Sequence, residues 1–129
     1  MISSGVFDYI NVLDKAADAS WTRNQIISNN IANVDTPNYK RQDVSFEEAL
    51  QRELRTATEN SLDEKVSRVS IDRLAADIYT DSAGYSYRMD GNNVDIDTEN
   101  VELASNQIKY EALVDSMSQE FARIKSVLK

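Results

Sequence analysis

The sequence predicts a mainly α-helical protein whose long N- and C-terminal helices pair as a coiled coil or helical bundle. Apolar side chains recur near both ends at alternating steps of four and three residues, which is the spacing of one helix face. The stretch between the ends lacks this spacing and contains the only proline, Pro37. We therefore expect three segments. They are an N-terminal coiled-coil helix over residues 1–35, a middle segment over residues 36–96 with an extended arm, a short helix at about 46–57 and an irregular, partly β region, and a C-terminal coiled-coil helix over residues 97–129.

The N-terminal helix is predicted from one continuous stripe of apolar and small side chains. The stripe consists of Val6, Ile10, Leu13, Ala17, Ser20, Asn24, Ile27, Ile31 and Val34. Its centre, formed by Ala17, Ser20 and Asn24, is too small or too polar for a strong hydrophobic seam, and asparagine also lowers helix propensity. We therefore expect this helix to be marginal in isolation.

The segment Asp35–Tyr39 is predicted to end the first helix. Pro37 disfavours helical geometry at the residue before it, and the Asn and Asp side chains around it favour turns. The chain is then expected to be extended as far as Val44. Ser45 and Glu48 have the spacing of a capping box, which predicts the start of the short second helix.

Residues 58–91 show only a weak pattern. Ile78–Thr80 and Gly84–Tyr87 have the composition of short strands, with a turn at Gly84. Acidic side chains outnumber basic ones between residues 61 and 100, so this part of the chain is predicted to face solvent and not to form core.

The C-terminal helix is predicted from a second apolar stripe. The stripe consists of Leu103, Asn106, Tyr110, Leu113, Met117, Phe121, Ile124 and Leu128, and it is widened by Val101, Ala104, Ile108, Ala112 and Val114. Asp97 or Thr98 is the expected N-cap, because either side chain can accept from the first backbone N–H groups of a helix. Arg123, Lys125 and Lys129 suit the negative end of the helix dipole.

Charge and composition argue against several classes of function. The net charge of −8 disfavours nucleic acid and anionic membrane surfaces as partners. Cysteine and histidine are absent and no glycine-rich phosphate loop is present, so we expect no enzyme, no cofactor and no small-molecule substrate. Residues 1–20 lack the basic start and apolar run of a signal peptide, and nowhere are about 18 apolar residues consecutive, so no membrane span is predicted.

The acidic and amide-rich stretch Asp90–Asp97 raises a calcium loop as an alternative. The spacing argues against it. A loop that starts at Asp95 has Asn100 at the glycine position and Asn106 at the position of the bidentate glutamate. A loop that starts at Asp90 has Asp95 at the glycine position. We therefore predict a turn and a helix cap here, and no metal site.

The two apolar stripes allow two arrangements. On spacing alone, the simpler interpretation is a helical hairpin within one chain. The weak centre of the first stripe and the few apolar residues of the middle segment would leave such a hairpin poorly covered. We therefore expect helices from neighbouring copies or partners to supply the missing burial.

Residues 28–40, with the sequence SNNIANVDTPNYK, combine asparagines with a proline and a tyrosine at fixed spacing. They resemble the N-terminal signature shared by the rod, hook and hook-associated proteins of the bacterial flagellum. Asn38 stands where many hook-type relatives have glycine, and residues 40–46, 90–97 and 104–110 are similar to proteins of the proximal rod. The resemblance covers both ends of the chain. The signature positions are Asn29, Asn30, Asn33, Thr36, Pro37 and Tyr39.

The resemblance implies a structural subunit of the flagellar basal-body rod. Members of this family pair their terminal helices as a coiled coil and stack into a helical tube. They are exported through the flagellar type III apparatus without a cleaved signal peptide, so the implied location is the rod outside the cytoplasmic membrane. The implied partners are other copies, other rod proteins and a membrane-ring or rod-adaptor protein at the rod base.

On this interpretation the apolar stripes are the assembly interface, and the signature residues shape the exit from the first helix and the start of the arm. The interface residues are Val6, Ile10, Leu13, Ile27, Ile31, Tyr110, Leu113, Met117, Phe121, Ile124 and Leu128. The alternative is a self-contained helical adaptor or export chaperone, whose paired helices would be stable in a dilute monomer.

Overall fold

The computed structural model of the chain describes residues 4–56, 61–82 and 88–128. The predicted strand at Gly84–Tyr87 lies outside the described residues. The elements are helix α1 (Ser4–Ala32), strand β1 (Gln42–Ser45), helix α2 (Glu47–Thr56), helix α3 (Leu62–Ser67), the 3-10 helix η1 (Ile71–Arg73), strand β2 (Asp77–Thr80) and helix α4 (Ile96–Val127).

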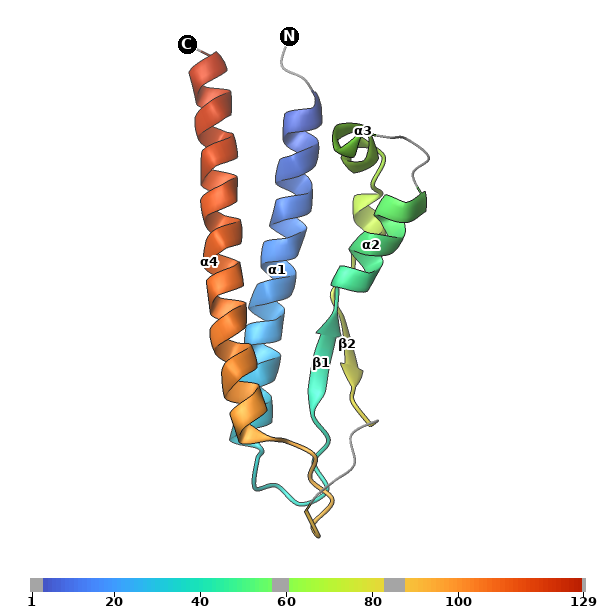
Figure 1. Cartoon of the computed structure of the whole chain (residues 1–129), viewed down its shortest axis with the longest axis vertical. Coiled ribbons are helices and arrows are strands. Elements are labelled where there is room, and N and C mark those ends of the chain that lie inside the picture. Colours follow the sequence, from blue (N-terminus) through green and yellow to red (C-terminus); the bar gives the residue numbers. More distant parts are fainter. Residues whose placement is uncertain (1–3, 57–60, 83–87, 129) are drawn as a thin grey trace.

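Helix α1 lies between α4 on one side and the middle segment on the other (Figure 1). α1 and α4 run antiparallel along most of their length, so that α1 begins at the same end of the molecule at which α4 ends. The described middle elements return along the opposite side of α1 and contact it through β1, α3 and η1. This arrangement confirms the predicted fold class, with long terminal helices that pack together, a short middle helix and a small β region.

The seam between α1 and α4 has a polar centre with buried apolar side chains of α1 on either side of it. Ile10 and Ile27 are buried in α1 on either side of Ser20, which is also fully buried. The Asn106 side-chain Nδ2 donates to the Ser20 carbonyl at 2.7 Å. Trp21 and Tyr110 meet with ring centroids 5.8 Å apart. The small and polar centre that the sequence predicted therefore joins the two helices by hydrogen bonding and close approach.

The opposite face of α1 packs against the middle segment, and the sequence analysis did not anticipate this contact. Ala19 forms a buried cluster with Phe46, Val69 and Leu74. The partly buried residues packed around this cluster are Val12, Ala16, Leu50, Leu54, Ile71 and Ala76. The expectation that residues 61–100 face solvent is thus wrong for Val69 and Leu74, which are buried against α1, whereas Leu62, Ile78, Tyr79, Met89 and Ile96 are exposed as expected.

The two strands form an antiparallel pair in which Gln42 lies opposite Thr80 and Val44 lies opposite Ile78. Val44 is buried, whereas every residue of β2 is exposed. The predicted strand at Ile78–Thr80 is therefore present, and its partner is the extended segment that follows the first turn.

Two predicted helix starts are displaced. Ser45 belongs to β1, its hydroxyl donates to the Asp77 carbonyl at 3.5 Å, and the Phe46 carbonyl accepts the first hydrogen bond of α2 from Leu50 N. The predicted N-cap at Asp97 or Thr98 is also wrong, because the Asp95 carboxylate accepts from both backbone N–H groups, at 3.0 and 3.4 Å. Strand pairing of Ser45 with Asp77 displaces the start of α2, whereas a local side-chain cap by Asp95 displaces the start of α4.

We predict that Leu74→Ala lowers the free energy of unfolding by about 2 to 5 kcal/mol, because Leu74 is buried against α1 and its truncation leaves a cavity. Leu62→Ala is the matched control, since Leu62 belongs to the same segment but is 61% exposed. Urea denaturation followed by circular dichroism measures both. Equal losses in the two variants would show that the middle segment does not pack on α1 as described.

Candidate functional site

A polar junction at the C-terminal end of α1 joins this helix to β1. The Asn30 side chain is fully buried. Its Oδ1 accepts from Gln42 N at 2.9 Å and from the Tyr39 hydroxyl at 3.0 Å, and its Nδ2 donates to the Gln42 carbonyl at 2.8 Å. One side-chain amide therefore bonds to both the backbone N–H and the carbonyl of Gln42, as a neighbouring strand would.

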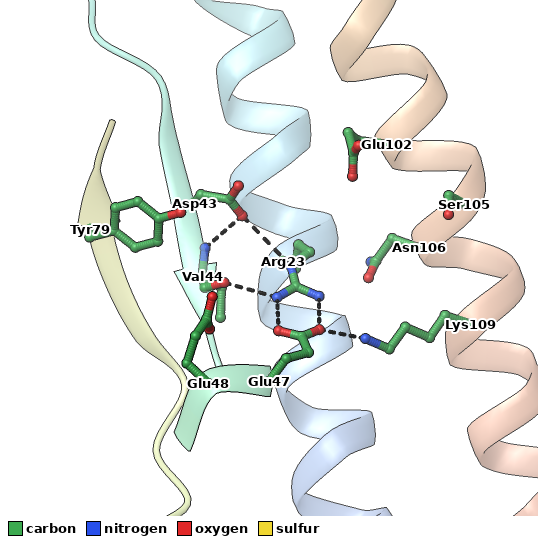
Figure 2. Close-up of a pocket in the computed structure, with 10 residues that line it drawn as sticks. All are labelled: Arg23, Asp43, Val44, Glu47, Glu48, Tyr79, Glu102, Ser105, Asn106 and Lys109. Atoms are coloured by element: carbon green, nitrogen blue, oxygen red, sulfur yellow. Dashed lines mark hydrogen bonds and ion pairs between the residues drawn. The ribbon is translucent and has the colours of Figure 1, made fainter. Parts of the chain in front are cut away.

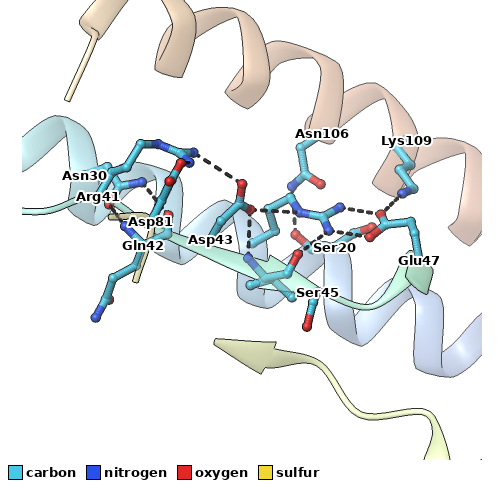
Figure 3. A network of polar contacts seen from close by, with 12 residues as sticks. Ser20, Asn30, Arg41, Gln42, Asp43, Ser45, Glu47, Asp81, Asn106 and Lys109 are labelled. Atoms are coloured by element: carbon cyan, nitrogen blue, oxygen red, sulfur yellow. Dashed lines mark hydrogen bonds and ion pairs between the residues drawn. The ribbon is translucent and has the colours of Figure 1, made fainter. Parts of the chain in front are cut away.

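The same junction reaches α4 through Glu99, whose side chain is 1% exposed. Figure 3 shows the neighbouring contacts of Asn30 and Arg41. Glu99 Oε2 accepts from Asn30 Nδ2 at 3.2 Å, and Oε1 accepts from Arg41 Nε at 2.6 Å. Arg41 also donates to Asp81 at 2.8 Å and to Asp43 at 3.3 Å. Burial alone would lower the pKa of Arg41, but the hydrogen bonds to Glu99 and Asp81 raise it above its ordinary value. A single guanidinium thus holds the start of α4 and both strands together.

A second buried amide, Asn92, closes the end of α1. Its Nδ2 donates to the carbonyls of Asn33, Val34 and Thr36 at 2.8, 3.0 and 2.8 Å. Arg88 also donates to the Val34 carbonyl. Asn33, Val34 and Thr36 follow the last residue of α1, so side chains from a distant part of the sequence bind the carbonyls of the turn that ends the helix.

The turn after α1 explains the asparagine that follows Pro37. Tyr39 N donates to the Thr36 carbonyl at 3.2 Å, and Asn38 has a φ of 61°, a left-handed conformation that Gly and Asn adopt more readily than other residues. Gly91 lies next to this turn and has a φ of 80°. A Cβ atom at this position would lie 2.5 Å from Asn38 Oδ1. The positive φ favours glycine at this position, whereas the close contact involves only the end of the Asn38 side chain, which can move.

The remaining signature residues bind one another around the same turn. Asn29 Nδ2 donates to the Tyr39 hydroxyl at 3.1 Å, Asn33 Nδ2 donates to the Asn29 carbonyl at 2.8 Å, and the Thr36 hydroxyl donates to Asn33 Oδ1 at 3.1 Å. Burial raises the pKa of the Tyr39 hydroxyl, which favours its protonated, donating form. The structure thus brings Asn29, Asn30, Asn33, Thr36 and Tyr39 together in a single network; Pro37 is exposed within the turn.

An ion-pair cluster joins the three layers in the C-terminal half of α1 (Figures 2 and 3). Both Arg23 terminal nitrogens donate to the Glu47 carboxylate at 2.6 Å, and one also donates to the Val44 carbonyl at 2.8 Å. Lys109 of α4 donates to the same carboxylate. The Arg23 hydrogen bonds hold the pKa of Glu47 far below its ordinary value of about 4.5, and Lys109 contributes in the same direction. The charges around this pocket of about 340 Å³ are largely engaged with one another, which is the arrangement of a structural ion-pair cluster.

The loop raised as a calcium candidate is occupied by structural contacts. Asp95 caps α4, Asn92 caps α1, and Asn93 accepts from Arg41 N at 2.7 Å. Within residues 4–56, 61–82 and 88–128 we find no cluster of three side chains suited to hold a metal ion. Over the same residues no helix has the length and hydropathy of a membrane span.

The residues predicted as an assembly interface fall into three groups. Ile10 and Ile27 are buried within the chain, whereas Phe121 and Leu128 are 54% and 67% exposed. Val6 lies in the first turn of α1, and its side chain is not among those described. The half-buried members are Leu13, Ile31, Tyr110, Leu113, Met117 and Ile124. Their role between subunits stays a prediction, since a single chain is described.

Sequence reasoning missed the residues that hold the junction from outside the signature, namely Arg41, Glu99 and Asn92. Arg41 and Glu99 are 58 positions apart, and Asn92 is 56 or more positions from the carbonyls that it caps. The only local signal was the density of asparagine near residues 30 and 92, which is unusual beside long helices. That signal indicates caps and turns but does not identify partners.

The fold and this junction define a helical protein held together by buried polar contacts, and comparisons with known proteins identify its class. Residues 10–40 match the family model described as "Flagella basal body rod protein". The chain is 37% identical over 127 residues to the flagellar basal body rod protein FlgB of Bacillus subtilis, covering 92% of each chain. It is 35% identical to FlgB of Borreliella burgdorferi, covering 87% of this chain and 89% of the relative.

A more distant relative, FlgB of Escherichia coli, is 27% identical and covers 82% of each chain. The similarity therefore extends over the terminal helices and the middle segment alike. The chain belongs to the flagellar basal body rod protein FlgB family.

We predict that Asn30→Asp lowers the free energy of unfolding by about 2 to 4 kcal/mol, because it removes the donor to Gln42 and places a second carboxylate against the buried Glu99. Asn100→Asp is the matched control, since Asn100 is exposed in the first turns of α4, where a negative charge is favourable. Urea denaturation at neutral pH measures the difference. A loss below about 1 kcal/mol for Asn30→Asp would contradict the described burial of this amide.

We further predict a loss of stability in mild acid that depends on Glu47. The pKa of Glu47 is lowered in the folded protein, so its contribution is fully present above the unfolded value of about 4.5 and is lost as the pH falls below it. Glu47→Gln should cost about 1 kcal/mol at pH 7, because the group is partly exposed, and should reduce the loss between about pH 5 and pH 3. Unfolding midpoints at several pH values measure this, with Glu48→Gln as the control. An unchanged acid dependence in Glu47→Gln would refute the assignment.

Proposed function

We propose that this chain is a structural subunit of the proximal rod of the flagellar basal body and assembles through its terminal helices into the tubular drive shaft. Membership of the FlgB family carries the proposal, because the similarity covers 92% of the chain and of the Bacillus subtilis relative. Both of those relatives are flagellar basal body rod proteins. The structure supports it through apolar surface that one chain does not cover.

Helix α4 carries most of this uncovered surface. Val101 and Ile108 are 67% and 69% exposed, and their spacing of seven residues places them on one face of the helix. Phe121 and Leu128 have the same spacing and are 54% and 67% exposed. Large apolar side chains repeated along a helix are typical of a surface that packs against further helices.

The α1–α4 seam is also weak for a permanent intrachain pair. Asn24 Oδ1 and Asn106 Oδ1 are buried and accept no hydrogen bond among the described residues. An unsatisfied buried carbonyl costs about 1 to 3 kcal/mol, so the pair is held less tightly than its length suggests. A helix pair of this kind suits export in an unfolded state followed by folding in contact with neighbours.

The proposed partners follow from the same role. Other copies of this chain and other rod proteins pack on its terminal helices, and a membrane-ring or rod-adaptor protein contacts it at the rod base. Export proceeds through the type III apparatus without a cleaved signal peptide. The proposed location is the rod outside the cytoplasmic membrane.

The alternative, a self-contained helical adaptor or export chaperone, agrees with the pairing of α1 and α4 within one chain. It does not account for the apolar faces of α4 that remain exposed in the monomer. The family of the chain also favours the rod over this alternative.

We predict that Leu128→Asp abolishes swimming without lowering the stability of the monomer. Leu128 is 67% exposed in the single chain, so a charge there leaves intrachain packing intact but prevents burial against a neighbour. Soft-agar swimming of a strain that carries the variant in place of its own gene measures assembly, and urea denaturation of the purified chain measures stability.

Ser126→Asp is the matched control, because Ser126 is an exposed polar residue in the last turn of the same helix. It should swim normally, since the predicted stripe does not include it. Normal swimming of the Leu128→Asp strain would show that the end of α4 is not an assembly surface.

A further inference from the structure

An open groove runs along one side of the α1–α4 pair, and no other segment among the described residues fills it. Trp21 and Phe121, which line it, are 53% and 54% exposed, and Val114 and Met117 of α4 line it between them. The wall from Tyr110 to Phe121 is about 16 Å long at about 1.5 Å per residue. A volume of about 520 Å³ and this length suit three turns of a helix that inserts apolar side chains.

The charged side chains that line the groove are both acidic. Asp14 and Asp18, both exposed, line its α1 side one helical turn apart, and no basic side chain is among the lining residues that the structure describes. Glu111 and Asp115 are exposed on α4 immediately around Val114. Lys109, which precedes Tyr110, is engaged with Glu47, and Arg123 is engaged with Glu120 at 2.8 Å. Lys15 follows Asp14 in α1 but is not among the lining residues, and Lys125 lies a turn beyond Phe121.

We propose that this groove binds an amphipathic helix of a different protein, one that carries lysine or arginine beside its apolar stripe. The apolar side chains would cover Trp21, Val114 and Phe121, and the basic side chains would pair with Asp14 and Asp18. The inference rests on the proposed rod function, in which unlike subunits meet, and it specifies the chemistry of one such neighbour.

A second copy of the chain is the less suitable occupant. Two copies that met groove to groove would bring their Asp14 and Asp18 side chains together, and like charges at short range are unfavourable. The net charge of −8 adds a general repulsion between copies at low salt. A basic partner avoids both the local and the general repulsion, and its positive side chains are attracted to Asp14 and Asp18.

The test titrates the full chain with two synthetic helical peptides about 18 residues long, both free of tryptophan. Both carry leucines at steps of three and four; one has lysines beside the leucines and the other has glutamates at the same positions. Trp21 is the only tryptophan of the chain, so its emission reports occupancy of the groove directly. We expect a blue shift with the lysine peptide, at least about tenfold weaker binding of the glutamate peptide, and weakening by salt.

Variants separate the groove from general attraction to an acidic protein. Asp14→Asn with Asp18→Asn should weaken binding of the lysine peptide by about five- to tenfold. Glu64→Gln with Asp72→Asn removes the same charge at exposed positions of the middle segment and should leave affinity nearly unchanged. Phe121→Ser should weaken binding while circular dichroism shows an intact fold.

Equal affinity for both peptides, no binding of either, or equal effects of the two paired charge variants would overturn the proposal. Sedimentation of the chain alone measures self-association. Self-association that Phe121→Ser abolishes would make a second copy the occupant of the groove and would also overturn the proposal. A negative peptide result beside a loss of swimming in Leu128→Asp would leave the rod function standing and refute only the groove assignment.

Discussion

The buried side-chain amide of Asn30 is the interaction on which the arrangement of the three layers depends. It bonds to both backbone groups of Gln42 and to the carboxylate of Glu99, so it fixes the end of α1 against β1 and against the start of α4. Arg41 then joins Glu99 to Asp81 and sets the position of β2. Because each partner is buried or half-buried, a shift of any element by one residue would leave a donor or acceptor unsatisfied.

Helix α1 meets a second constraint, since two faces of one helix are covered at the same time. Ile10, Ser20 and Ile27 belong to the buried α4 side, while Ala16 and Ala19 pack with the middle segment. Small residues on both sides allow three layers to approach closely around a single helix. Arg23 bonds to Glu47, which Lys109 of α4 also contacts, so the ion-pair cluster links α1, α2 and α4.

The sequence predicted the fold class because the α4-facing stripe repeats every three to four residues over about eight turns. Such a local repeat can be recognised without knowing which segment packs against it. It did not predict the second face, since Val12, Ala16 and Ala19 are few and small, and Phe46 and Leu74 follow them at distances that no local pattern spans. Ser45 illustrates the same limit: its capping spacing with Glu48 was correct as a pattern, but pairing with Asp77 made it part of a strand. The signature asparagines were identified as a group by resemblance, whereas the partners Glu99, Arg41 and Asn92 could be found only in three dimensions.

The antiparallel course of the terminal helices gives the subunit two chemically different ends. At one end, buried amides and an arginine bind the turns together, and at the other, Phe7, Val127 and Leu128 leave aliphatic and aromatic carbon open to water. Because the two ends of the subunit differ, a column built by repeated end-to-end contacts along its axis has a direction. Growth of such a column would be vectorial, because its two tips would present unlike surfaces to the next subunit.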